Sequence, residues 1–81
     1  MNTAGMASYM NLSGQSNVVA YRCNAGSITV EFAGGRWRFY LYTNSSAGAA
    51  TISMMQRLAE EGSGLNSFID HFAKRSYAER V

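Results

Sequence analysis

The chain has 81 residues, of which 47% are hydrophobic and 15% are charged, and its formal net charge is +2. These values exclude a disordered chain and leave room for one small domain, near the size at which a single hydrophobic core is just sufficient. All the cationic residues except Lys74 are arginines. A surplus this mild is compatible with an anionic partner but does not require one.

Targeting and redox signals are few. Cys23 is the single cysteine, which excludes an internal disulfide. Residues 1–15 lack a basic start and an unbroken apolar run, and no segment approaches the ~20 apolar residues of a membrane helix. We therefore expect a cytoplasmic protein without a membrane segment. Residues 1–15 are predicted to be a flexible tail or a short edge strand at "ASYMNL", and residues 16–81 to form one compact domain.

Three segments after the tail predict antiparallel strands: "NVVAYRC", "SITVEF" and "WRFYLY". The first is expected to place Val19, Tyr21 and Cys23 against the core, and "NAGS" turns the chain into the second. Gly34 and Gly35 can both adopt the positive φ angles of a two-residue hairpin turn before the third strand.

A turn at Gly34 and Gly35 defines a register for the hairpin. One face would pair Phe32 with Trp37, Val30 with Phe39, and Ile28 with Leu41. The other would pair Glu31 with Arg38, Thr29 with Tyr40, and Ser27 with Tyr42. A slip by one residue would exchange the faces, and each cross-strand pair contributes roughly 0.2–1 kcal/mol. This register predicts that Trp37 and Phe39 are core residues.

The second half of the chain has helical patterns. "SSAGAATISMMQRLAEEG" begins with Ser or Asn capping candidates and ends at Gly62, which suits the left-handed position after a helix. "LNSFIDHFAKRSYAERV" follows with apolar residues at helical spacing. The order predicts an α+β domain: an antiparallel meander of three strands, or four with an N-terminal edge strand, and two C-terminal helices packed on one face.

The chain resembles the KTSC domain, a family found at the C-terminus of some lysyl-tRNA synthetases. The resemblance covers about residues 16–80 and is carried by "SNVVAY", "ITVEF", a glycine turn, "WRFY" and "GSGLNSFI", in which Gly62, Leu65, Asn66 and Ile69 match the family spacing. The chain departs from the family at "TNSSAG", where a Val-Pro step is usual, and at Glu60, where a serine is frequent. The resemblance implies no catalytic activity, and the synthetase context implies RNA.

Catalytic and metal-binding patterns are weak. Cys23 and His71 are the one pair that could act as nucleophile and base, but Cys23 is expected in the core. Glu60 and Glu61 are neighbours at a helix end and are expected to be solvated. No metal-ligand spacing is present. "GSG" at 62–64 is interpreted as a capped helix connection, with Ser63 or Asn66 as the cap, rather than a phosphate cradle. We expect no enzyme, no metal and no cofactor.

The best binding candidates form a row on the predicted face away from the helices, namely Arg22, Arg36, Arg38, Tyr40 and Tyr42. Such a row is compatible with three interpretations: a solvated sheet face, a protein contact, or stacking and phosphate contacts with RNA or another single-stranded nucleic acid. The leading prediction is a non-enzymatic binding module that contacts another protein, including a second copy of itself in a homodimer. RNA binding is the alternative. A small phage- or mobile-element-encoded inhibitor of a host complex is a further one.

Overall fold

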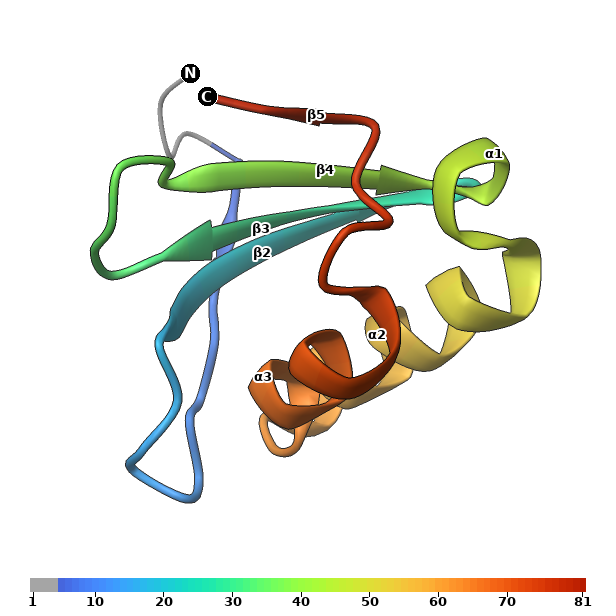
Figure 1. Ribbon diagram of the computed structural model, residues 1–81. Coiled ribbons are helices and arrows are strands. Elements are labelled where there is room, and N and C mark those ends of the chain that lie inside the picture. The colour runs from blue at the N-terminus through green and yellow to red at the C-terminus, as the bar shows by residue number, and fades with distance from the viewer. Residues whose placement is uncertain (1–4) are drawn as a thin grey trace.

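The computed structural model describes residues 5–81, which form one antiparallel sheet with helices on one face (Figure 1). The sheet has five strands in the order β1-β2-β3-β4-β5. Their bounds are β1 Ala7–Ser8, β2 Val18–Asn24, β3 Ser27–Phe32, β4 Phe39–Thr43 and β5 Glu79–Arg80. The helices between β4 and β5 are α1 Asn44–Ala47, α2 Ala49–Glu61, α3 Leu65–Phe68 and the π-helical turn η1 Ile69–Ala73. The predicted α+β class is confirmed, with more strands than expected.

The additional strands lie at the two edges of the sheet. β1, part of the predicted tail or edge strand, pairs with β2, and residues 1–4 lie outside the described part. At the other edge the predicted helix over 65–81 ends early, and β5 pairs with β4. The N–H of Ala78 donates to the carbonyl of Leu41 at 2.7 Å, and the N–H of Val81 to that of Phe39 at 2.9 Å. β5 thereby satisfies backbone groups that an exposed β4 edge would leave unpaired.

The hairpin register differs from the prediction by one residue. Val30 lies opposite Tyr40, and Ile28 lies opposite Tyr42. The strands are joined by a longer loop, residues 33–38, in which Gly35 has a positive φ of 101° and Gly34 does not. The two-residue turn, which needs suitable angles at both positions, therefore does not form. Because side chains alternate across a strand, this register turns Tyr40 and Tyr42 toward the helices.

The predicted core positions of Phe39 and Trp37 are consequently wrong. Phe39 faces the open side of the sheet with Leu41, and Trp37 lies half-buried in the loop. On β2, a bulge between Val18 and Ala20 buries Val18 and leaves Val19 39% exposed. Tyr21 and Cys23 pack against the core as predicted.

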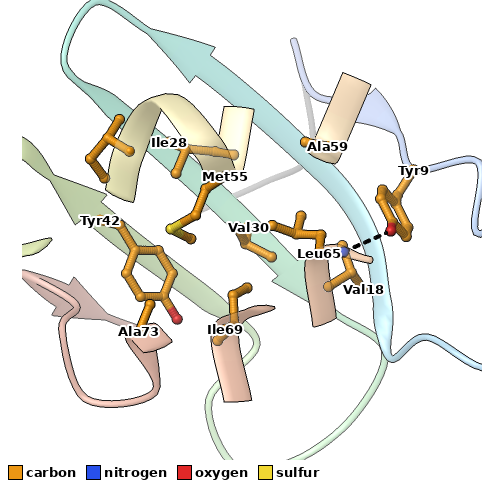
Figure 2. Close-up of a cluster of buried hydrophobic side chains, with 11 residues drawn as sticks. Tyr9, Val18, Ile28, Val30, Tyr42, Met55, Ala59, Leu65, Ile69 and Ala73 are labelled. Atoms are coloured by element: carbon orange, nitrogen blue, oxygen red, sulfur yellow. Dashed lines mark hydrogen bonds between the residues drawn. The ribbon is translucent and has the colours of Figure 1, made fainter. Parts of the chain in front are cut away.

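The core lies between the sheet and the helix layer (Figure 2). The sheet and β1 region contribute Tyr9, Val18, Ile28, Val30 and Tyr42, and the helices contribute Ile52, Met55, Ala59, Leu65, Ile69 and Ala73. These positions follow the helical spacing of the sequence, which buries one face of each helix. No helix within residues 5–81 has the length and apolar character needed to cross a bilayer.

Gly62 separates α2 from α3, as predicted. Its φ of 77° and ψ of 19° are left-handed, and its N–H donates to the carbonyls of Leu58 and Ala59. Such a C-terminal position is favourable for glycine because a Cβ is strained there. The turn places α3 and η1 beside the sheet, next to the 33–38 loop.

Candidate binding cleft

The predicted Arg/Tyr row does not form one surface. Arg22 lies on the open face, opposite Thr29, and its Nε is buried without a hydrogen-bond partner among residues 5–81. Arg38 is tied to the sheet: its Nη2 lies 3.0 Å from Glu31 Oε2, and its Nε donates to the carbonyl of Phe32. The remaining members of the row, Arg36, Tyr40 and Tyr42, line a cleft on the helix side. The one-residue difference in register is the cause.

This cleft lies between the 33–38 loop and the α3–η1 segment and has a volume of about 320 Å³. Aromatic rings of Phe32, Trp37 and Tyr40 line it from the sheet and the loop, and Ile69 lines it from η1. Polar and charged side chains complete the lining, namely Asn17, Arg36, Asn66, Asp70 and Lys74. A concave site that combines aromatic walls with polar groups is typical of ligand binding.

Aromatic contacts hold Tyr40 in place. Its ring meets Phe32 edge-to-face at 5.2 Å and 81°, and Tyr77 edge-to-face at 5.3 Å and 85°. It also stacks on Tyr42 at 6.4 Å and 14°. Pairs of this kind contribute about 0.5–1.5 kcal/mol each beyond area burial. The aromatic wall is therefore ordered before any ligand arrives.

Trp37 is flanked by two guanidinium groups. The Cζ of Arg36 lies 5.6 Å from its ring centroid and that of Arg80 lies 4.8 Å from it. Arg80 also lies 4.9 Å from the ring of Tyr77. Both distances to Trp37 fall within the ~6 Å range of cation–π attraction. Strand β5, which sequence reasoning missed, thus supplies a side chain that positions the tryptophan.

Tyr42 brings a polar group to the inner end of the cleft. The residue is only 1% exposed, yet it lines the cleft. Its hydroxyl forms no hydrogen bond within residues 5–81 and is not among the fully buried unpaired atoms, so it keeps contact with solvent. Burial raises the pKa of the Tyr42 phenol above its ordinary value, and Tyr40, Tyr77 and Asp70 act in the same direction. The phenol is therefore neutral near pH 7 and can both donate and accept a hydrogen bond.

The helical side of the cleft carries Asn66, Asp70 and Lys74. Sequence reasoning did not select these residues as a site, although their spacing of four places them on one helical face. With Arg36 on the loop, the charged side chains of the lining are two cations and one carboxylate. The cleft is therefore mildly positive.

The other sequence candidates show no comparable arrangement. Cys23 lies on β2, where burial, and to a smaller extent the Glu60 carboxylate, raises the pKa of its thiol. This direction disfavours the thiolate that a nucleophile needs. His71 is exposed, with its Nδ1 2.8 Å from the carbonyl of Ser67. No group of three or more His, Cys, Asp or Glu that could hold a metal occurs between residues 5 and 81.

One backbone N–H at the start of α3 is already occupied. The Leu65 N–H, which an anion cradle would offer, donates to the Tyr9 hydroxyl instead. The predicted cap, Ser63 or Asn66, is wrong, because Gly64 occupies the N-cap position without a side-chain bond.

In chemical terms, the cleft can enclose a flat or apolar group, offer it one hydrogen bond, and attract a neighbouring negative charge. Comparisons of the chain with protein family models, with curated proteins and with solved structures found no match.

Proposed function

We propose that the protein is a non-enzymatic binding domain that recognises a segment of another protein in the cleft between the 33–38 loop and η1. The observation that carries the proposal is the ordered aromatic wall, in which Trp37 and Tyr40 are half-buried and held by neighbouring rings and guanidinium groups. Tyrosine, tryptophan and arginine are the residues most enriched at the centres of protein interfaces. An ordered wall also lowers the entropy that binding has to overcome.

RNA binding is the second candidate, because Arg36 and Lys74 lie beside the rings of Trp37 and Tyr40 in the cleft. Single-stranded nucleic acid is bound by stacking on aromatic rings with cations along the backbone. Two features favour protein over RNA. Asp70 places a carboxylate in the cleft, and the rings of Phe32 and Tyr77 already pack perpendicular to the Tyr40 ring, which limits the stacking of a base on it. A second copy of the chain, or a host complex that the domain inhibits, is a special case of the protein partner.

Membership of the KTSC family and a cytoplasmic location are part of the same proposal. Three of the residues that carry the resemblance occupy positions where their residue type is required: Gly62 has a left-handed backbone, and Leu65 and Ile69 are buried. Cys23 is a free thiol, which suits a reducing compartment.

The proposal is tested by affinity capture from the native host, with and without nuclease treatment. A cleft variant combines Arg36→Glu with Lys74→Glu. A matched control combines Arg57→Glu with Arg75→Glu, which changes the charge equally at exposed positions outside the cleft. We expect a nuclease-resistant protein partner that the cleft variant loses and the control retains.

Two outcomes contradict the proposal. A partner that is lost on nuclease treatment indicates RNA. A protein partner that is retained by the cleft variant indicates a different surface. Circular dichroism of both variants confirms that they are folded.

A further inference from the structure

We infer that the cleft takes one aromatic side chain with a polar tip, of the tyrosine kind, from a partner segment that carries an acidic residue beside it. This inference rests on the proposed function and specifies the chemistry of its ligand. Three observations support it: the size of the cleft, the hydroxyl at its inner end and the charges at its mouth.

The cleft is large enough for one bulky side chain of a partner. A volume of about 320 Å³ lies at the lower end of the ~300–1,000 Å³ found for small-ligand pockets. The apolar walls from Phe32, Trp37, Tyr40 and Ile69 favour a side chain with a large apolar body. Aromatic rings meet this requirement with little loss of conformational entropy.

The Tyr42 hydroxyl favours a polar tip on that side chain. The Tyr42 side chain is nearly completely buried and lines the cleft. Its hydroxyl has no hydrogen-bond partner among the described residues, yet it is not fully buried. An occupant that reaches this hydroxyl with a group of its own satisfies it, whereas a purely apolar occupant seals it off from water without a partner. A phenol on the occupant can form this hydrogen bond, because its hydroxyl and that of Tyr42 can each donate or accept.

The charges at the mouth favour a carboxylate next to the aromatic residue. Lys74 is one helical turn from Asp70, which offsets part of its charge. Arg36 lies across the cleft on the loop, is exposed, and forms no ion pair within residues 5–81. Arg80 adds a second guanidinium against the same tryptophan ring. A partner carboxylate is therefore best placed on the loop side, near Arg36.

The sole tryptophan of the chain gives a direct readout, because Trp37 itself lines the cleft. The probes are short peptides blocked at both ends, with a central Glu-Tyr, Glu-Phe, Lys-Tyr or Glu-Ala pair, and uridine 5′-monophosphate. Each is titrated to about 10 mM, above the millimolar dissociation constant of a weak contact. Excitation at wavelengths where tyrosine does not absorb isolates the Trp37 emission.

We expect the Glu-Tyr peptide to change the emission saturably and the Glu-Ala peptide to have no effect. Lys-Tyr is expected to bind about tenfold more weakly, and Glu-Phe about threefold to tenfold more weakly. Arg36→Glu should reverse the preference between Glu-Tyr and Lys-Tyr, while Arg57→Glu leaves it unchanged. Tyr42→Phe, which retains the ring, should abolish the preference for Glu-Tyr over Glu-Phe.

Contrary results separate the inference from the proposed function. Equal binding of Glu-Tyr and Lys-Tyr, or no response to any peptide, overturns the inference. The capture experiment then decides on the proposed function. If the parent captures a nuclease-resistant protein and the cleft variant does not, the proposed function stands with a different ligand chemistry. A response to the nucleotide alone, together with nuclease-sensitive capture, overturns both.

Discussion

The hydroxyl of Tyr9 accepts a hydrogen bond from the backbone N–H of Leu65, 3.2 Å away and 56 positions along the chain (Figure 2). Leu65 is the first residue of α3, so its N–H has no carbonyl within the helix to bond. Close by, the N–H of Leu12 donates to the carbonyl of Gly62 at 2.8 Å. The N-terminal segment is thus joined to the turn that orients α3 and η1, and through them one side of the cleft.

Replacing Tyr9 by phenylalanine should destabilise the protein by about 1–3 kcal/mol, because the buried Leu65 N–H is left without an acceptor while the ring still fills its place. Urea denaturation measures the change. Tyr77→Phe is the control, since its hydroxyl makes no hydrogen bond within residues 5–81. Equal stability of Tyr9→Phe and the parent would show that the bond contributes nothing.

Gly62→Ala should destabilise more than Gly64→Ala. Both glycines have positive φ, 77° and 86°, so the backbone strain of adding a Cβ is similar. At Gly62, however, the new Cβ would lie 2.6 Å from the Cβ of Met10, whereas at Gly64 the nearest atom is 3.7 Å away. Thermal unfolding of the two variants isolates the clash. Matching losses of stability would mean that the N-terminal segment moves aside without penalty.

The local elements of this fold are readable from the sequence. Alternation and turn residues located β2, β3 and β4, helical spacing located the buried side of α2, and Gly62 marked its end. Each of these signals arises within a few neighbouring residues. The α+β class follows from their order.

The register of β4 could not be predicted, because both faces of the strand are apolar enough to be buried in the core. Phe39 and Leu41 lie on one side, and Tyr40 and Tyr42 lie on the other. Two adjacent glycines also permit either a tight turn or a longer loop, so the loop length did not decide between them. The choice depends on contacts with Tyr77 and β5, which are distant in sequence.

The candidate site was readable only in part, for the same reason. Arg36, Tyr40 and Tyr42 were selected by residue type and do line a common cleft, but on the opposite side of the sheet from the one expected. The helical contribution from Asp70 and Lys74 depends on how η1 packs against the loop. A pattern confined to one element does not contain that information.

Arg38→Ala should destabilise the protein by about 1–3 kcal/mol, although sequence reasoning placed Arg38 in an exposed row. Glu31 is 6% exposed, and Arg38 is its ion-pair partner and a donor to the Phe32 carbonyl. Removing the guanidinium group leaves the buried Glu31 carboxylate without its ion-pair partner. Arg36→Ala is the matched control and should change stability by no more than about 0.5 kcal/mol. Chemical denaturation of both variants measures the difference. Indistinguishable midpoints would mean that water or another donor replaces Arg38 at the Glu31 carboxylate.

Tyr42 should make the stability of the protein fall at alkaline pH. Burial raises the pKa of its phenol in the folded state, while the unfolded chain loses the proton near the ordinary value of about 10. Above that pH the folded state binds more protons at this position than the unfolded state, so the free energy of unfolding decreases as pH rises. The contribution is fully present below about pH 10, with a limiting slope of about 1.4 kcal/mol per pH unit above it.

Tyr42→Phe should therefore be less sensitive to alkali than the parent. The comparison is the urea midpoint at neutral pH and at several values above about pH 10. Some alkaline loss should remain, because burial also raises the pKa of Tyr21 and of the Cys23 thiol. The parent should in addition show a tyrosinate absorbance step that coincides with unfolding, and this step should be smaller in the variant, which retains Tyr21. If both proteins lose stability with the same slope, the Tyr42 phenol ionises in the folded state as it does in the unfolded one, and burial does not raise its pKa.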